Sequence, residues 1–471
     1  MSTRPRFWLA ILGCCCLWAL TGAAQDSQQQ KLDRQYQEAV AQYGAGRYGD
    51  AIAKLETLLP FAPDSFEIHE LLGLSYASQS KDTQAIQHLT AAVQLNPKSA
   101  AARTNLAASL SHAGKTTLAG EQFKKALELE PDDYDANHNL AEFYVQAGKL
   151  TEARPLLETA QRIHPDSYDN GYDLALADSL TGMLAEARHL IQTLLQQKDT
   201  GELHNLLGQI EEKDGQYVAA VNQFQIAAHL DPSDDNLFDW GSEMLLHRTY
   251  EPAIDVFQNA SQRYPKSPRL LIGLGMSLYS LGKYDEAVQA LLSAADLDPA
   301  DARCYLFLSK AYDSSPALAS GVIDRFKRYA DLQPDNALAQ YYYAMSLWKG
   351  KRTEDATVDM KMVESLLQRS ISLDNKLPEA HVQLGNLYAD QHAWEKSIPE
   401  YERALQLNPT LPDAHYRLGQ DYVHVGKKEN AQAEFDVYQK QRAQHMAEID
   451  KERAEVQQFV YSEKNGSAAK P

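Results

Sequence analysis

The side chains best suited to chemistry in this sequence are fourteen histidines and Cys304, the one cysteine beyond the first 24 residues. Histidines at short spacing would indicate a metal site or an acid–base catalyst. Here they are scattered, and some stand at equivalent places 34 residues apart, as His381 and His415 do. Residues spaced in this way are too far apart to share a metal ion, so we expect them to serve helix packing.

Short motifs that mark common catalytic sites are also missing. The chain has no Gly-x-x-x-x-Gly-Lys-Ser/Thr loop for phosphate, no His-Glu-x-x-His pair and no Cys-x-x-Cys pair. Cys304 has no cysteine beyond residue 24 to pair with, and we expect it to be a small buried hydrophobic residue. We therefore predict no cofactor, no metal and no enzymatic activity.

The elements that position these residues follow a fixed period. Proline recurs every 34 residues at Pro63, Pro97, Pro131 and Pro165, and close to the same register at Pro232, Pro265, Pro299, Pro334 and Pro409. A period of this length indicates an array of one supersecondary unit instead of a single globular domain. Such arrays mainly present surfaces to partners.

Each unit has the pattern of two amphipathic helices. In one of them, Leu274, Leu278, Ala287, Leu291 and Ala294 stand at helical spacing. Glycines separate the first helix from the second, and the proline ends the second helix. These glycines are Gly114, Gly148, Gly182 and Gly282.

The pattern resembles the tetratricopeptide repeat (TPR) family, with its Leu-Gly, Tyr, Ala, Phe, Ala and Pro positions. The consensus Trp is mostly replaced, by His69, His204, His381 and His415 among others. A small residue follows the Leu position in twelve units: Ala39, Gly73, Ala107, Ala141, Ala175, Gly208, Gly241, Gly275, Ser309, Ala344, Gly385 and Gly419. The resemblance implies an all-α fold, a right-handed α-solenoid of about twelve helix-turn-helix units over residues 32–438, with a C-terminal capping helix.

Three units depart from the pattern. The fifth has Asp199 in place of proline, the ninth has Pro316 in place of the turn glycine, and the tenth is longer by seven residues around Lys351–Lys361. The extra residues are either a tolerated surface insertion or a segment that contacts a partner.

The family resemblance places the partner-binding groove on the first helix of each unit. Groove positions of the early units are polar, for example Glu67 and Glu70, whereas those of units seven to ten are apolar or aromatic. Exposed apolar surface with aromatic anchors is typical of interaction sites. The groove residues expected are Phe238, Ile272, Met276, Tyr279, Leu306, Tyr341, Met345 and Trp348. The alternative is that these side chains pack between the helices.

The two ends differ from the repeats. Arg4 and Arg6, an apolar run and Gly22-Ala23-Ala24 indicate a secretory signal peptide over residues 1–24, followed by a Gln-rich linker at 25–31. The alternative is a lipid anchor on Cys14. Residues 439–461 have the pattern of a charged helix that caps the array or contacts a partner through a coiled coil, and we expect residues 462–471 to be a disordered tail.

Charge limits the class of partner. Without its first 24 residues the chain has 43 basic and 64 acidic residues, a net charge of −21. Nucleic acids are bound through Lys and Arg clusters, which this chain lacks. We therefore expect a periplasmic or secreted scaffold that binds a protein or peptide partner. The alternative is an accessory subunit of an envelope assembly or export machine, for polysaccharide, pilus or outer-membrane biogenesis.

We predict that the exported chain begins at Gln25, because signal peptidases cleave after small residues such as Ala24. Intact-mass measurement of protein purified from the cell envelope checks this. A mass that includes Met1, or a diacylglycerol group on Cys14, would contradict it.

Overall fold

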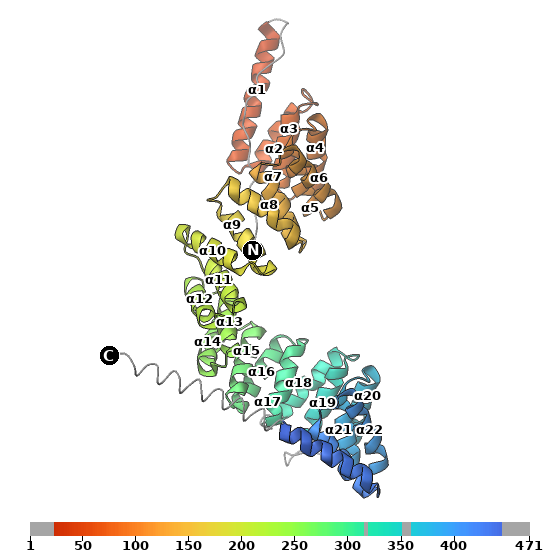
Figure 1. Cartoon of the computed structure of the whole chain (residues 1–471). Helices are drawn as coiled ribbons and strands as arrows, with labels where there is room; N and C mark the ends of the chain where they lie inside the picture. Colours follow the sequence, from red (N-terminus) through yellow and green to blue (C-terminus); the bar gives the residue numbers. More distant parts are fainter. Residues whose placement is uncertain (1–22, 315–318, 351–358, 445–471) are drawn as a thin grey trace, which may run out of the picture. The chain divides into compact units, whose positions relative to one another are not determined.

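The computed structural model describes residues 23–314, 319–350 and 359–444, and these residues form α-helices joined by short turns, with no β-strand among them. The chain divides into two compact units, residues 1–231 and 232–471 (Figure 1). The all-α repeat architecture predicted from the sequence is confirmed.

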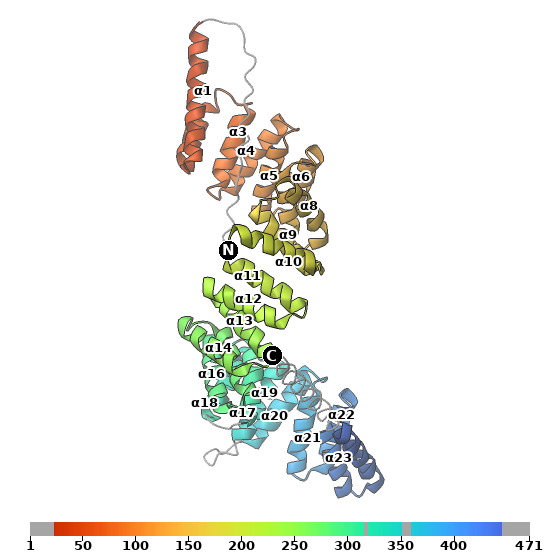
Figure 2. The same cartoon turned by 60° about the vertical axis from the view of Figure 1, so that its left-hand side comes forward.

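The described residues of the first unit form six helix pairs. They are α1 (Ala23–Gly44), α2 (Tyr48–Leu58), α3 (Phe66–Ala77), α4 (Asp82–Leu95), α5 (Ala100–His112), α6 (Thr116–Leu129), α7 (Tyr134–Gln146), α8 (Leu150–Ile163), α9 (Tyr168–Thr181), α10 (Leu184–Gln197), α11 (Gly201–Lys213) and α12 (Tyr217–Leu230). Each odd-numbered helix packs against the even-numbered helix that follows it (Figure 2).

The second unit continues the same alternation. Its helices are α13 (Asp234–Leu246), α14 (Tyr250–Arg263), α15 (Pro268–Ser280), α16 (Tyr284–Leu297), α17 (Ala302–Ser314), α18 (Ala319–Leu332), α19 (Ala337–Gly350), α20 (Met360–Leu373), α21 (Pro378–Asp390), α22 (Trp394–Leu407), α23 (Pro412–His424) and a last helix at residues 428–444. Below, the odd-numbered helix of a pair is its first helix, and the even-numbered helix, or the last helix, is its second.

Local signals explain where the helices begin and end. Ser65 caps α3 by accepting a hydrogen bond from the Ile68 amide, and Asp133 caps α7 in the same way. Gly114 and Gly282 take the left-handed conformation between the two helices of their pairs, at φ 71° and 84°. The expectation that these glycines separate the two helices of a pair is thereby met.

One close contact recurs inside the helix pairs. The small residue of the first helix faces a large residue that stands sixteen positions later on the second helix. A Cβ atom added to Gly275 would lie 2.5 Å from Cγ of Leu291, and one added to Gly241 would lie 2.8 Å from Cζ of Phe257. Alanine takes the place of glycine in other pairs, and there too both residues are buried, as Ala107 and Phe123 are.

A polar contact also recurs, at the position of the consensus Trp. His69 Nε2 lies 2.9 Å from the Pro63 carbonyl oxygen and His69 Nδ1 lies 3.1 Å from His88 Nδ1, so this side chain joins the preceding turn to the second helix. The same nineteen-residue spacing pairs Arg103 with Gln122. It also forms His204–Gln223, His381–Glu400 and His415–Glu434. These histidines serve packing, as the sequence analysis expects.

Ion pairs and hydrogen bonds link successive pairs to each other. The guanidinium of Arg188 on α10 donates to Glu211 on α11 at 2.9 Å and to Asp214 at 2.6 Å. In the second unit, the Tyr422 hydroxyl of α23 donates to Glu402 of α22 at 2.6 Å. The polar groups that these contacts bury are therefore hydrogen-bonded.

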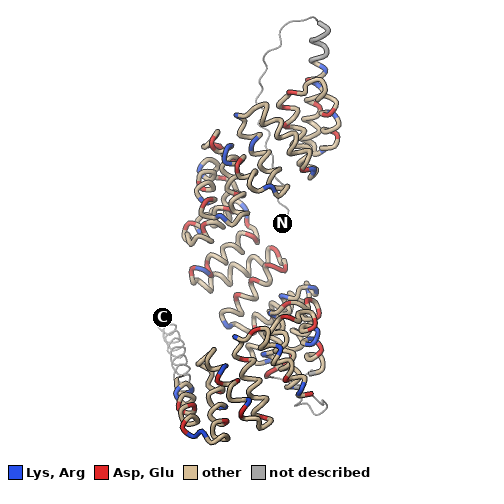
Figure 3. The backbone as a smooth tube through the Cα atoms, turned by 90° about the vertical axis from the view of Figure 1, so that its right-hand side faces the viewer, with Lys and Arg blue, Asp and Glu red and all other residues tan. Residues whose placement is uncertain are grey.

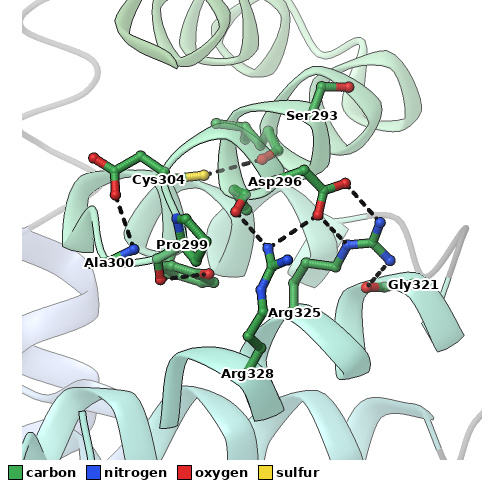
Figure 4. Close-up of polar contacts among 12 residues, drawn as sticks. Ser293, Asp296, Pro299, Ala300, Cys304, Gly321, Arg325 and Arg328 are labelled. Carbon is green, nitrogen blue, oxygen red and sulfur yellow. Dashed lines mark hydrogen bonds and ion pairs between the residues drawn. The ribbon is translucent and has the colours of Figure 1, made fainter. Parts of the chain in front are cut away.

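Helix α18 is docked in an unusual way, mainly on α19 and only weakly on its own partner α17. Arg325 and Arg328 of α18 both pair with Asp296 near the end of α16, at 2.8 and 3.1 Å, and Arg328 also donates to the Ala295 carbonyl (Figure 4). The Arg325 guanidinium holds the pKa of Asp296 below its usual value. Cations at a helix C-terminus also interact favourably with its dipole.

Cys304 lies in the same region and is fully buried, as predicted from the sequence. Its thiol donates to the Leu291 carbonyl oxygen at 3.1 Å (Figure 4), and burial raises its pKa to about 12. A thiol with so high a pKa is a poor nucleophile at neutral pH.

Several expectations for the ends and the insertion fall outside the described residues. These are residues 1–22 of the signal peptide expected over 1–24, Pro316, residues 351–358, and the parts of the capping helix and tail beyond residue 444. The segment expected to be a linker, residues 25–31, is helical and continuous with α1. Among the described residues no helix is long and apolar enough to cross a membrane.

We predict that Gly275→Leu lowers the free energy of unfolding by about 1–3 kcal/mol, because the new side chain overpacks the contact with Leu291. Gly321→Ala is the matched control. A Cβ there meets Leu292 at an ordinary 3.7 Å, so this change should be neutral or stabilise by about 0.5–1 kcal/mol. Chemical denaturation followed by circular dichroism measures both. Equal effects of the two substitutions would refute the close-contact explanation.

Candidate partner-binding site

A cavity of about 360 Å³ lies on the first helices of the last four pairs. Helices α17, α19, α21 and α23 all contribute to its wall. The lining residues are Ser309, Asp313, Tyr341, Met345, Trp348, Lys349, Gln383, Asn386, Asp390 and Arg417. Three of them, Tyr341, Met345 and Trp348, belong to the groove set predicted from the sequence.

Helix α19 supplies the apolar part of the lining. Tyr341, Met345 and Trp348 are four and three residues apart, a spacing that places them on one face of the helix. All three are half-buried, so part of each side chain stays open to the cavity. Burial raises the pKa of the Tyr341 hydroxyl, which therefore stays protonated at physiological pH.

Two further helices supply amide and charged groups. Asn386 accepts a hydrogen bond from the Tyr401 hydroxyl at 2.6 Å and donates to Gln383 at 3.1 Å. Asp390 and Arg417 are exposed, and neither forms a side-chain hydrogen bond or an ion pair within the described part of the chain. The cavity therefore combines an apolar face with amides and with one unpaired charge of each sign.

Lys349 pairs with Asp313, which ties α19 to α17 at the edge of the cavity. The lining has two acidic residues, Asp313 and Asp390, and two basic residues, Lys349 and Arg417, so its net charge is zero, although the chain as a whole is acidic. Figure 3 shows acidic and basic residues interspersed along the helices of both units.

The cavity coincides with an irregular helix pair. Ser309 stands at the small-residue position but is only half-buried, whereas its counterparts Gly275 and Ala344 are buried. Four residues separate α17 from α18, one more than separate α15 from α16, so the large residue Phe326 stands seventeen positions after Ser309; its ring packs 5.6 Å from the Tyr305 ring. We infer that the weak packing of α18 on α17 leaves the face of α17 around Ser309 open.

Five residues of the predicted groove do not line this cavity. Ile272 is 6% exposed and belongs to the hydrophobic core, in agreement with the alternative that it packs between the helices. Met276 and Tyr279 are half-buried and pack against the same core. Phe238 is covered by Arg269, whose guanidinium lies 5.1 Å from the ring. Leu306 remains exposed, at 38%.

Sequence reasoning missed the polar part of the lining. Asn386 and Asp390 stand in α21 where Met345 and Lys349 stand in α19, so alignment of these two repeats would have found them. They were missed because only apolar and aromatic residues were assigned to the predicted groove. Arg417 occupies a different helical position and gave no such signal.

Acidic residues crowd the first helices of the first unit. Asp173 on α9 has a pKa raised to about 6, mainly by burial and further by Glu142, Asp169 and Glu202, although His138 opposes this. Burial raises the pKa of Glu70 on α3 to about 6 in the same way. These carboxylates destabilise the unit when they are all ionised. Among the described residues no group of three metal-ligating side chains lies close enough together to hold an ion.

A second cavity of about 450 Å³ lies between α18, α19 and α20. Its lining includes Lys327, Tyr343, Met362, Leu366 and Arg369. None of these residues belongs to the predicted groove, and Met362 there is 40% exposed.

Family models described as tetratricopeptide repeat or TPR repeat match residues 36–100, 110–170, 145–210, 245–311 and 385–426. A curated relative is "Small glutamine-rich tetratricopeptide repeat-containing protein 2" of Saccharomyces cerevisiae. It is 24% identical over 139 residues, which cover 30% of this chain and 36% of the relative. The chain thus matches about a third of that protein's length.

Solved structures of several helical proteins also match at low similarity. The Cut9–Hcn1 hetero-tetramer of APC/C matches with a TM-score of 0.37, 15% identity and coverage of 86% of this chain and 85% of that chain. PilF of Pseudomonas aeruginosa matches with a TM-score of 0.37 and 20% identity, over 44% of this chain and 94% of that chain. YrrB, described as a TPR protein with an unusual peptide-binding site, matches with a TM-score of 0.33 and 20% identity, over 39% of this chain and 96% of that chain.

We predict that Asp173→Asn raises the free energy of unfolding at pH 7 by about 1–2 kcal/mol, since one pKa unit corresponds to about 1.4 kcal/mol. The folded state of the wild type binds more protons than the unfolded state near pH 5–6. Its stability should therefore rise as the pH falls from 7 to 5, and the variant should show a smaller rise. Denaturant titrations at both pH values measure this.

Asp166→Asn, at an exposed turn position, is the control and should change stability by less than about 0.5 kcal/mol. If Asp173→Asn destabilised the protein at pH 7, the repulsion described for α9 would not exist.

Proposed function

Because the chain belongs to the tetratricopeptide repeat family, we propose that it is a scaffold that binds a segment of a partner protein in the cavity lined by α17, α19, α21 and α23. The observation that carries this proposal is the meeting of Tyr341, Met345 and Trp348 with unpaired Asp390 and Arg417 in one cavity. Large aromatic side chains in a partly enclosed site are typical anchors of protein interfaces.

The lining indicates what a partner segment would contact. An apolar side chain of the partner would pack against Trp348 and Met345, where both surfaces lose contact with water. The amides of Gln383 and Asn386 could hydrogen-bond the partner's backbone. Arg417 and Asp390 would then select for charges at the ends of the bound segment, because unpaired charges favour complementary partners.

The same lining argues for binding instead of catalysis. Asp313, the carboxylate nearest in sequence to the Ser309 hydroxyl in the lining, is already paired with Lys349. We therefore propose that the protein is not an enzyme.

We also propose that the protein works outside the cytoplasm, as a periplasmic or secreted protein with a cleaved signal peptide. Arg4, Arg6 and the apolar run that follows support this, with lipidation of Cys14 as the alternative. Its role in the cell would be that of a general scaffold or of an accessory subunit of an envelope assembly or export machine. Identification of the proteins captured from envelope extract separates these two roles.

We predict that Trp348→Ala and Tyr341→Ala each weaken partner binding about 30-fold, since loss of an aromatic anchor commonly costs about 2 kcal/mol. The partner is first captured from envelope extract with the wild-type chain, and the affinity of each variant is then measured by calorimetry. Met362→Ala, in the second cavity, is the control and should bind like the wild type.

Circular dichroism confirms that each variant is folded before its affinity is compared. Wild-type affinity of both folded variants would place the binding site elsewhere on the chain.

A further inference from the structure

The second cavity, of about 450 Å³ between α18, α19 and α20, has a buried amide in its lining. This amide belongs to Gln340 on α19, which is 8% exposed. Among the described residues, none lines both this cavity and the one that contains Tyr341, Met345 and Trp348. The two cavities are therefore separate sites.

Gln340 stands at the position of the consensus Trp, one repeat before His381. In other pairs the residue at this position contacts the second helix nineteen positions later, as His381 contacts Glu400. The seven extra residues before α20 shift the matching place to Leu366, which lines the same cavity as Gln340. An aliphatic side chain forms no hydrogen bond, so Gln340 lacks the polar partner on the second helix that His381 has.

The orientation of the Gln340 amide follows from its two neighbours. Nε2 lies 3.4 Å from the carbonyl oxygens of Ala330 and Pro334, which have no proton to give. The nitrogen must therefore face these carbonyls, and Oε1 is the other end of the group. Oε1 accepts no hydrogen bond within the described part of the chain, and it is not sealed from solvent. The cavity thus contains an accessible hydrogen-bond acceptor on an otherwise buried side chain.

Apolar surface surrounds this acceptor. Tyr343 of α19 is buried and Leu366 of α20 is half-buried, and both line the cavity together with Ala330 and Pro334. An aromatic ring placed here would pack against the Tyr343 ring and lose contact with water. An acceptor in such surroundings favours a ligand that donates, because an unpaired polar group is costly there.

Basic side chains stand at the mouth of the cavity. Lys327 of α18 and Arg369 of α20 belong to the lining, and both are exposed, whereas Gln340 is buried. Lys327 pairs with Asp331 at 2.7 Å and Arg369 pairs with Asp335 at 3.0 Å, and both carboxylates are exposed. Exposed ion pairs of this kind contribute little to stability, so the guanidinium remains able to bind a ligand carboxylate with its planar fork of N–H groups.

We propose that the second cavity binds an aromatic carboxylic acid whose ring carries an N–H donor. The ring packs against Tyr343 and Leu366, the N–H donates to Oε1 of Gln340 inside the cavity, and the carboxylate pairs with Arg369 at its mouth. Cavities of about 300–1,000 Å³ with apolar walls and a few polar groups are typical sites for small molecules.

Two matched probes test the site by saturation-transfer difference NMR on the full chain. Indole-3-propionate has about fourteen non-hydrogen atoms, and at ordinary ligand efficiency it should bind with a Kd of about 1 mM or tighter. 1-Methylindole-3-propionate lacks the N–H and should bind about tenfold more weakly, because it leaves Oε1 unpaired. Equal affinities of the two probes, or no binding of indole-3-propionate, would overturn the proposal.

Gln340→Leu removes the acceptor and keeps a side chain of similar size. The preference for the N–H probe should fall from about tenfold to less than about twofold. Gln289→Leu, at an exposed position on α16, is the matched control and should keep the full preference. A full preference in Gln340→Leu would show that the probe binds elsewhere, and would overturn the proposal. If circular dichroism shows that Gln340→Leu is unfolded, the two probes still decide on the wild type.

Arg369→Gln tests the contact with the carboxylate. Its affinity for indole-3-propionate should fall about fivefold, since an exposed ion pair is lost. Its affinity for the uncharged indole-3-propionamide should equal that of the wild type. Arg162→Gln, which removes an exposed ion pair on α8, is the control and should bind both probes like the wild type. Wild-type affinity of Arg369→Gln for indole-3-propionate would refute the proposed role of Arg369.

Discussion

The rest of this structure depends on the close approach of two helices at one point in each regular pair. A side chain no larger than alanine on the first helix receives a large buried side chain of the second, as Gly275 receives Leu291. This approach sets the separation of the helices and therefore the surface that each pair offers to the next. Because protein interiors are densely packed, a larger residue at this point would displace the whole helix.

In several repeats a hydrogen-bonded polar side chain takes the place of the consensus tryptophan between the two helices of a pair. The TPR consensus places a large aromatic residue on the first helix, whereas this chain places His, Arg or Asn there in several units. A buried polar group destabilises a protein unless it is hydrogen-bonded. His69, Arg103 and Asn137 each satisfy this requirement with the carbonyl of the proline six residues earlier. The proline that ends one helix thereby also anchors the next one.

The candidate site lies where this regular packing is interrupted. Helix α18 packs little on its own partner α17 and is held by the pairing of Arg325 and Arg328 with Asp296. Ser309 is left half-buried beside the cavity, and Tyr341, Met345 and Trp348 of the next first helix face the same space. A regular array would cover the Ser309 position with its own second helix, so the irregular pair accounts for the opening there.

Most of the architecture could be read from local sequence patterns. Three patterns recur along the sequence: the proline period, the turn glycines, and the small residues at positions such as Ala141 and Gly208. Each reflects a packing or turn requirement within one helix pair, and because every pair has the same requirement the pattern repeats. The aromatic face of Tyr341, Met345 and Trp348 was predicted for the same reason, since it follows from helical spacing alone. The division of the chain at residue 231 was not predicted, because the repeat pattern continues across it.

Tertiary structure decided which predicted residues are accessible and which polar residues join them. Ile272 has the composition and spacing of a groove residue, but its burial depends on how the neighbouring helices pack. Asp390 and Arg417 come to one cavity from α21 and α23 through the stacking of successive pairs, and no pattern within either helix records that encounter. The contact of His415 with Glu434 likewise depends on where the last helix docks. Local sequence specifies the helices and their close contacts, whereas contacts between successive helix pairs form the site.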